Sequence, residues 1–478
     1  MIGIPSSTIR RKDAGMEAMT SYAVCDAQPS GGHPLLDAFR DHLNDGDLDQ
    51  AIASEGVAFR KRDFPPAVTF WTFLIQVFHV GASCRNALIR LRSVRPGSTE
   101  GQSPPIRTGT YCKARQRLPE SLLNRLARLV ADRADSEARP WDWKGHSVKM
   151  VDGTTVSMPD TRANQEAFPQ AKNQKPGLGF PVTRLVAVIG LACGCVVRTA
   201  LAPWAGKGRG EGSLLAGILD AFRPNELLIG DRYYSVYWLL ASLSGRGVYY
   251  VGALAKTRRP DYRTGRRLGP TDRVGVWHKP PRYAKQPGLS DAAWEALPEC
   301  IEVRRMRIRL DKPGFRTQIL HLVTTLLDAE RYSKGDVAGL YRHRWQIELH
   351  FRALKEDMEM GILRCKSPQM IRKEIAMHMI VYTLVRAVMV RAAMAVQRVP
   401  YRMSFTAARE AIEAYSSQLA DPTRREAARK EMFELIGSQH IDDRPGRLEP
   451  RCLKRTPKDC EHMTKPRTQY HRVTRSVS

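Results

Sequence analysis

The feature that most constrains the fold is a series of short apolar segments that end in an acid and alternate with helical patterns. Residues 147–151 are expected to form a strand that ends at Asp152, before a Gly-Thr-Thr turn, and residues 226–230 a strand that ends at Asp231. Further strands are expected at 185–192, 195–201, 248–254 and 317–327, and helices at 211–222 and 236–243. Such alternation indicates an α/β fold, and an acid that follows a buried strand is exposed at the sheet edge, where ligands gather.

Composition divides the chain into four segments. Residues 1–33 are polar and lack periodicity, which predicts disorder, whereas residues 34–145 show helical spacing. The α/β pattern covers 146–400 and is interrupted at 256–316 by a segment with 16 Lys or Arg, which we interpret as an inserted, mainly β subdomain. Residues 401–478 are expected to form a helical segment and, from Arg447, an extended arm with nine Lys or Arg against three acids.

The charge of the chain points to a polyanionic partner. Its 478 residues include 76 Lys or Arg and 49 Asp or Glu, which gives a formal net charge of +27. Nucleic acid is the first candidate partner, and a membrane surface or the ribosome is the alternative. The helical segment 34–145 is accordingly expected to be a DNA-binding domain, although its basic residues would also suit a solvated surface.

We expect neither a membrane span nor secretion. The longest apolar stretch, 375–396, is interrupted by a histidine and two arginines, so it is expected to be a buried helix. The basic residues near the N-terminus are not followed by an apolar stretch, so no signal peptide is expected. The nine cysteines lack disulfide spacing, and Cys193 and Cys195 lie in an apolar run that predicts a core position. Reduced thiols and a cytoplasmic, nucleoid-associated location follow as expectations.

Two further features resemble cofactor sites without meeting their requirements. Cys452, Cys460, His462 and His471 cluster near the C-terminus, but their spacing fits no common zinc finger. The glycine-rich segment 206–212 resembles a phosphate-binding loop but lacks the Gly-Lys-Ser/Thr ending, so no nucleotide cofactor is expected. A basic loop that leads into a helix can still meet a DNA phosphate.

Residues 341–355 carry a helical stripe that is poorly suited to a core. At about 100° per residue, Tyr341, Arg344, Glu348 and Lys355 fall within an arc of roughly 60°. The two cations can hold phosphate oxygens, and the carboxylate can hold a metal ion. The alternative is a solvated face on which Glu348 pairs with Arg352. Against that alternative, the other faces of the predicted helix carry apolar residues, namely Trp345, Ile347, Leu349, Phe351 and Leu354.

Asp152, Asp231 and Glu348 together form a candidate metal site. Each aspartate alone is more often a helix cap or a turn residue. Combined with a glutamate on a packed helix, they provide the hard oxygen ligands that Mg²⁺ or Mn²⁺ prefers, and three carboxylates can hold two such ions about 3.5–4 Å apart.

The spacing Tyr341–x2–Arg344–x3–Glu348–x6–Lys355 resembles the signature of bacterial insertion-sequence transposases of family four. The chain is similar to that family also around Asp152 (Val-Asp-Gly-Thr-Thr), around Asp231 (Gly-Asp-Arg-Tyr-Tyr), and at residues 111–119. The resemblance implies an RNase H-like core with a β insertion and a catalytic Asp-Asp-Glu triad that holds two Mg²⁺ or Mn²⁺ ions. It also implies excision and insertion of DNA through terminal inverted repeats, often with hairpinned ends, by a homodimer on paired ends.

The resemblance further implies that residues of the insertion stabilise a flipped base at the hairpin. Trp277 and Trp294 are the candidates, since aromatic rings stack on unstacked bases, although each would also suit the core or the surface. Trp345 is expected to pack beneath the active site. Two other functions stay open: a catalytically silent DNA-binding protein derived from a transposase, and an RNase H-like nuclease that cuts without joining strands.

Overall fold

The computed structural model describes residues 33–56, 64–93, 107–172, 174–258, 260–282, 285–310, 318–441, 463–465 and 469. Three predictions fall wholly or largely outside these residues: the disordered tail 1–33, the cysteine–histidine cluster at 452–471, and the basic arm.

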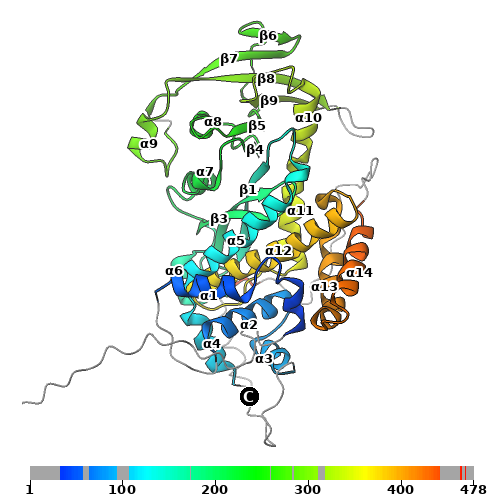
Figure 1. Cartoon of the computed structure of the whole chain (residues 1–478). Coiled ribbons are helices and arrows are strands. Elements are labelled where there is room, and N and C mark those ends of the chain that lie inside the picture. The colour runs from blue at the N-terminus through cyan, green and yellow to red at the C-terminus, as the bar shows by residue number, and fades with distance from the viewer. Residues whose placement is uncertain are drawn as a thin grey trace, which may run out of the picture.

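A nine-stranded mixed sheet runs through the molecule (Figure 1). Its strand order is β3-β2-β1-β4-β5-β9-β8-β7-β6. The strands are β1 Val148–Ser157, β2 Val182–Gly190, β3 Val196–Pro203, β4 Leu227–Gly230, β5 Tyr249–Ala253, β6 Arg266–Gly269, β7 Asp272–His278, β8 Cys300–Leu310 and β9 Gln318–Thr324. The predicted α/β class is confirmed.

The sheet combines two pairing patterns. β1, β2 and β3 form an antiparallel meander, whereas β4 and β5 run parallel to β1. Parallel neighbours need a crossover, and helix α8 (Tyr237–Ser244) supplies it between β4 and β5. The predicted helix 211–222 is shorter than expected, because α7 (Glu211–Ala216) ends at Gly217 and only a 3₁₀ turn, Leu219–Ala221, follows.

The segment 256–316 does not form a separate sheet. Its strands β6, β7 and β8 extend the central sheet by antiparallel pairing onto β9, at the end farthest from the helical part of the molecule (Figure 1). A buried ion pair stabilises this extension, because the Arg304 guanidinium on β8 lies against the Asp272 carboxylate on β7, with an Nε–Oδ1 distance of 2.8 Å. The helix α9 (Asp291–Glu295) lies in the connection between β7 and β8.

Helices from both ends of the chain form one body beside the sheet (Figure 1). They are α1 Asp45–Ser54, α2 Pro66–Phe78, α3 Cys84–Ser93, α4 Thr108–Arg117, α5 Glu120–Glu137, α12 Pro368–Ala395, α13 Phe405–Ala420 and α14 Arg425–Ser438. Helix α12 packs against α2, α5, α13 and α14. One apolar cluster runs from the N-terminal helices through α12 to the C-terminal ones, so the segments 34–145 and 401–441 share a core.

Helix α12 contains the long apolar stretch noted in the sequence. Among the described residues it alone is long and apolar enough to cross a membrane, and 94% of its most apolar window is buried inside the protein. Its Arg386 donates from Nε to the backbone carbonyl of Cys193 at 3.0 Å. The expected burial of this helix, and of Cys193 and Cys195, is confirmed.

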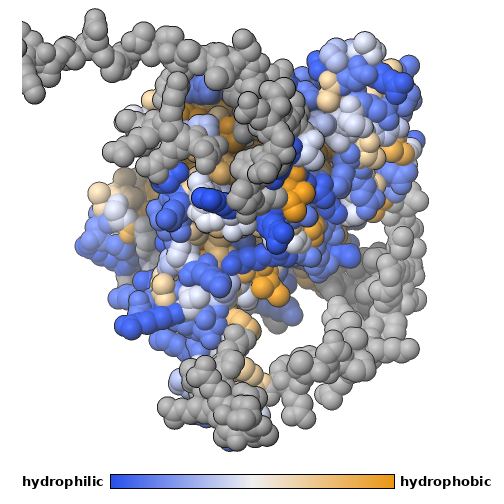
Figure 2. Space-filling model, turned by 90° about the horizontal axis from the view of Figure 1, so that it is seen from below, coloured by the Kyte–Doolittle hydropathy of each residue, from blue (hydrophilic) through white to orange (hydrophobic). Residues whose placement is uncertain are grey.

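Two apolar clusters cover the two faces of the sheet. Met150 and Ile229 belong to the cluster shared with α10 (Lys334–Arg342) and α11 (Gln346–Arg352), whereas Val151 and Leu228 belong to the cluster of α7 and α8. Alternating strand residues thus face opposite helix layers. Seen from below Figure 1, the described surface is mostly hydrophilic, with apolar side chains in separate patches (Figure 2).

Candidate active site

The first aspartate lies within a strand rather than at its end. β1 continues through Asp152 and the Gly-Thr-Thr segment to Ser157, because β2 pairs with it along its whole length, with Asp152 opposite Ala187. The predicted turn after Asp152 is therefore wrong. The second aspartate does follow its strand, since β4 ends at Gly230. There the Asp231 carboxylate accepts a hydrogen bond from the backbone N–H of Tyr233 at 2.8 Å.

The two aspartates lie at neighbouring strands of the sheet. Met150 and Ile229 are paired in the parallel register of β1 and β4, and Asp152 and Asp231 stand two residues further along each chain. Residues two apart on a strand share a face, and adjacent strands lie about 4.8 Å apart. Because Met150 packs on the side of α11, Asp152 is directed toward that helix, and Asp231 lies at the neighbouring strand, just beyond the end of β4.

The spacing of about 100° per residue assumed one continuous helix for the segment that carries the third acid, Glu348. The structure divides this segment instead. Between α10 and α11 lies a 3₁₀ turn, His343–Trp345, and after α11 a π-helical turn, Ala353–Asp357. Short π turns inside helices often occur at functional sites. Here the turn contains Lys355, whose Nζ lies 3.5 Å from the Thr154 Oγ1 on β1, on the same face as Asp152.

The remaining residues of the stripe lie around Arg344. Its Nη2 is 3.3 Å from Glu348 Oε1, and its Cζ lies 4.6 Å from the centre of the Trp345 ring. The pairing of Glu348 with Arg352 does not occur, since Arg352 donates to Glu356 at 2.9 Å. Trp345 is also not beneath the site, because it is 62% exposed.

The electrostatics of Asp152 reflect a cluster of negative charge. The pKa of Asp152 is raised from 3.8 to about 6, mainly by burial and in part by the charges of Asp231 and Glu211. The N–H of Gly153 and the charge of Arg344 oppose this rise. Burial likewise raises the pKa of Tyr341, against the charge of Arg344. Two side chains of the stripe, Tyr341 and Arg344, therefore lie within electrostatic reach of the aspartates.

Sequence reasoning missed Glu211 as a site residue. This first residue of α7 lies on the other face of β1, in the space that Gly153 leaves free: a Cβ on Gly153 would lie 2.3 Å from Glu211 Cδ. The hydroxyl of the buried Tyr234 donates to Glu211 Oε2 at 3.3 Å. The only signal in the sequence was an acid that ends a glycine-rich basic loop.

The arrangement fits a divalent cation at the aspartates. Asp152 and Asp231 are partly buried, hard oxygen donors whose mutual repulsion a cation would relieve. In the described part of the chain, no three His, Cys, Asp or Glu side chains are grouped closely enough to hold a metal ion. Glu348 does not join the two aspartates in such a group, because its side chain is 47% exposed and pairs with Arg344.

A family comparison identifies the chain. The family model described as the transposase DDE domain matches residues 143–384, which are 242 of the 478 residues and contain all three acids. This chain belongs to the DDE transposase family. The family catalyses metal-dependent DNA cleavage and strand transfer, so the protein is an enzyme that acts on DNA.

Relatives of this transposase agree with the sequence resemblance. It is similar to the transposase InsG of insertion sequence element IS4 from Escherichia coli K12, with 26% identity over 75% of this chain and 77% of that protein. A shorter match reaches 43% identity with the transposase of insertion sequence element IS421 from Escherichia coli, over 11% of this chain and 14% of that protein. The resemblance to insertion-sequence family four is confirmed.

One solved structure also aligns with the transposase. It is a piggyBac transposase synaptic complex with hairpin DNA, at 9% identity and a TM-score of 0.39, over 86% of this chain and 85% of that one. This likeness is too low to argue from.

The two tryptophans of the transposase insertion differ in their surroundings. Trp294 on α9 is 2% exposed and belongs to the apolar cluster of α7 and α8, which argues against the stacking role expected for it. Trp277 on β7 is half-buried beside a pocket of about 360 Å³, and the guanidinium of Arg258 lies 4.9 Å from its ring centre. Arg305 also lines this pocket.

Proposed function

We propose that this transposase cuts and rejoins DNA at the terminal inverted repeats of an insertion sequence, with Asp152, Asp231 and Glu348 as its catalytic triad. The observation that supports this best is the placement of Asp152 and Asp231 at adjacent strands, within electrostatic reach of each other, with Asp152 on the sheet face covered by α11, which carries Glu348. The strand order β3-β2-β1-β4-β5, with an antiparallel meander followed by two parallel strands, supports an RNase H-like core.

The three carboxylates would hold two Mg²⁺ or Mn²⁺ ions. When bound, such ions supply an activated water or 3′-hydroxyl and stabilise the leaving oxygen. The chain's own cations would bind the DNA backbone beside them: Arg344 and Lys355 as phosphate contacts, with the Tyr341 hydroxyl as a further polar contact. Lys355, in the π turn, reaches Thr154 on β1, and Arg344 contacts Glu348 and acts electrostatically on Asp152.

A basic loop that precedes α7 would extend the DNA path along the sheet edge. The guanidinium of Arg184 stacks over the Trp204 ring at 4.3 Å and donates to the Arg209 carbonyl at 2.8 Å, which orders the loop. Lys207, Arg209 and Arg232 are exposed, and none of the three forms an ion pair with a described acid. Unpaired cations flanking a carboxylate cluster suit a phosphodiester backbone.

Further parts of the chain would contribute to end recognition. The helical segment 34–145 and the basic C-terminal arm would bind the terminal repeats, and the half-buried Trp277 with Arg258 would stack on an unstacked base. On the basis of the family resemblance, we propose that the protein acts as a homodimer in which each subunit processes one DNA end.

The test is a strand-transfer assay with purified full-length protein, Mg²⁺ and a DNA fragment that carries both terminal repeats. Nicked or hairpinned ends followed by joining into a target plasmid would support the proposal. Binding of the repeats without any cleavage would favour a catalytically silent DNA-binding protein instead. Cleavage that ignores the repeats and never yields joined products would favour a plain nuclease.

A further inference from the structure

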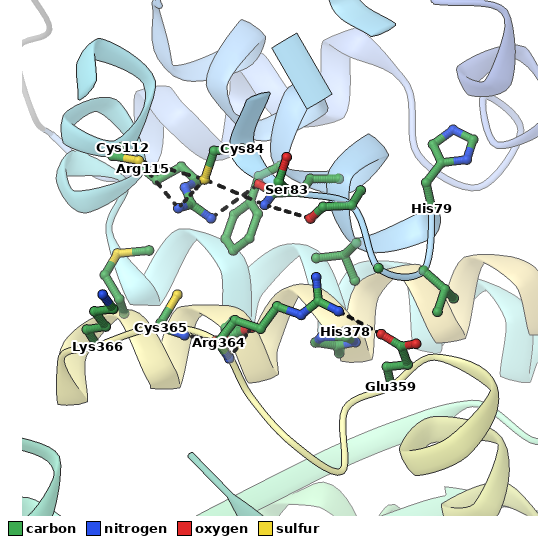
Figure 3. Close-up of a pocket in the computed structure, with 18 of the residues that line it drawn as sticks. His79, Ser83, Cys84, Cys112, Arg115, Glu359, Arg364, Cys365, Lys366 and His378 are labelled. Atoms are coloured by element: carbon green, nitrogen blue, oxygen red, sulfur yellow. Dashed lines mark hydrogen bonds and ion pairs between the residues drawn. The ribbon is translucent and has the colours of Figure 1, made fainter. Parts of the chain in front are cut away.

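A pocket outside the active site holds two thiols that lie close together. It measures about 580 Å³ and lies between the N-terminal helices α2 to α4 and the chain around the start of α12. Figure 3 shows Cys84 and Cys112 together on the wall formed by the N-terminal helices, whereas Cys365 lies on the opposite wall. The sulfur atoms of Cys84 and Cys112 are 3.7 Å apart, and both residues are half-buried.

A buried arginine without a carboxylate partner accompanies the two thiols. Arg115 donates from Nη2 to Cys84 Sγ at 3.2 Å and to Cys112 Sγ at 3.8 Å, and from Nη1 to Gln76 Oε1 at 3.3 Å. Its guanidinium also lies 4.9 Å from the centre of the Phe73 ring. No described acid forms an ion pair with Arg115, and its Nη2 donates to both sulfurs.

We infer that Cys84 and Cys112 form a reversible disulfide when the protein meets a peroxide. A disulfide requires a sulfur–sulfur distance of about 2.05 Å, and the present 3.7 Å leaves a small approach that side-chain rotation can supply. The bond would join the first residue of α3 to the middle of α4, two helices that already pack together. The disulfide would link two cysteines that are 28 positions apart in the sequence.

The chemistry balances without any group beyond the peroxide. A thiolate of the pair attacks one peroxide oxygen and the O–O bond breaks. Hydroxide is released, and that cysteine becomes a sulfenic acid. The second thiol then attacks this sulfur, the S–O bond breaks, and water leaves as the S–S bond forms. The two thiols lose two electrons in total, and the peroxide is reduced to water.

The nearby charges favour this pair over Cys365. Burial raises the pKa of Cys84, whereas the positive charge of Arg115 opposes that rise and stabilises the thiolate. Burial and the charge of Glu374 both raise the pKa of Cys365, whose backbone N–H donates to that carboxylate at 2.9 Å. Because the thiolate is the nucleophile, Cys365 should react more slowly than the pair, and the pair should react faster as pH rises.

The experiment is peptide mapping of the full-length protein after brief treatment with hydrogen peroxide and alkylation of the remaining thiols. We expect a linked Cys84–Cys112 peptide to accumulate, faster at pH 9 than at pH 7, while Cys365 stays alkylated. The unfolding temperature should rise by several degrees on oxidation and return with dithiothreitol, since a cross-link restricts the unfolded chain.

Cys84→Ser and Cys112→Ser should each abolish the linked peptide and the shift in unfolding temperature, and the matched control Cys365→Ser should change neither. The inference is overturned if no linked peptide forms in the natural chain under conditions that oxidise glutathione. It is also overturned if the main link joins other cysteines. Because the mapping uses the unaltered protein, a serine variant that fails to fold does not affect this outcome.

Discussion

Arg344 Nη2 lies 3.3 Å from Glu348 Oε1, and the charge of the same guanidinium also acts on Asp152. One cation therefore contacts the carboxylate on the helix and acts electrostatically on the carboxylate on the sheet. A DNA phosphate that binds Arg344 would compete with Glu348 for it, which would leave Glu348 free to turn toward the aspartates. Phosphate binding and assembly of the proposed acidic site would thus be coupled through a single side chain.

The first prediction concerns the three acids. Asp152→Asn, Asp231→Asn and Glu348→Gln should each lower DNA cleavage by about a thousandfold or more, because each removes a ligand on which the chemistry depends. Binding of repeat-containing DNA should change little, since affinity comes mainly from Lys and Arg contacts with phosphates. Cleavage and gel-shift assays measure the two effects.

Glu356→Gln is the matched control for the acids. Glu356 lies about two helical turns beyond Glu348, is exposed and, among the described residues, pairs only with Arg352. The Glu356→Gln variant should cut DNA at close to the rate of the natural protein. A triad variant that cuts as fast as this control would remove that acid from the site.

The second prediction concerns the metal. Carboxylate sites prefer Mg²⁺ or Mn²⁺, so EDTA should stop cleavage and either ion should restore it, whereas Zn²⁺ should not. Titration of Mn²⁺ followed by its electron paramagnetic resonance signal should show tight binding to the natural protein and weaker binding to Asp152→Asn. Cleavage that persists after thorough chelation would contradict a metal-dependent site.

The third prediction concerns pH and stability. The pKa of Asp152 is about 6 in the folded protein, above the ordinary value of 3.8. Protonated Asp152 therefore contributes to the free energy of unfolding fully below pH 4, and this contribution is lost as pH rises through 6. In metal-free buffer, Asp152→Asn should therefore exceed the natural protein in free energy of unfolding by about 1–3 kcal/mol at pH 8, with little difference at pH 4. Urea unfolding at the two pH values measures this.

Two further variants qualify the pH result. Glu211→Gln removes one of the negative charges that raise the pKa of Asp152, so it should move the pH dependence to lower pH. The exposed Asp160→Asn should show no such pH-dependent gain. A gain for Asp152→Asn that is the same at pH 4 and pH 8 would argue against the raised pKa.

Local patterns predicted some of the elements around the three acids but not others. The strand before Asp231 and the helix after it were predicted correctly, because each is a short apolar run bounded by polar residues. The end of β1 was predicted wrongly, because Gly-Thr-Thr after Asp152 has the composition of a turn. Its strand conformation depends on β2, whose residues pair with it from 25 or more positions away. Such pairing is a tertiary effect that a local pattern does not contain.

Side-chain partners were the least predictable part of the site. An ideal wheel places Arg352 near Glu348, but the backbone tightens into a 3₁₀ turn before α11 and widens into a π turn after it. Glu348 then pairs with Arg344, and Arg352 with Glu356. Glu211 approaches Asp152 only because Gly153 lacks a side chain, a relationship between two elements that are 58 residues apart in sequence.

The fourth prediction compares three cations on one segment. Arg344→Ala and Lys355→Ala should weaken cleavage or end-complex formation more than Arg352→Ala does. Arg344 contacts Glu348 and Lys355 reaches Thr154 on β1, whereas Arg352 is exposed and pairs only with Glu356. Single-turnover cleavage and gel shifts on end DNA measure the three variants side by side. Equal losses in all three would mean that the segment is a general basic face.

The fifth prediction separates the two tryptophans of the insertion. Trp277 is half-buried on β7, with the Arg258 guanidinium over its ring, and it lines a pocket that Arg305 also borders. Stacking of a base on such a ring contributes about 1–3 kcal/mol. Since about 1.4 kcal/mol is tenfold in rate, Trp277→Ala should slow hairpin formation by roughly 5- to 150-fold while sparing the first nick.

Trp294→Ala should instead act on stability. Its ring is buried against the α7–α8 cluster, so its loss creates a cavity and should lower the free energy of unfolding by about 3–5 kcal/mol. For the fraction that stays folded, nicking and hairpin formation should fall together rather than separately. Nicks and hairpins followed as distinct products on end-containing DNA distinguish the two variants. If Trp277→Ala forms hairpins at the rate of the natural protein, the stacking role is lost and the insertion serves only as a basic clamp on DNA.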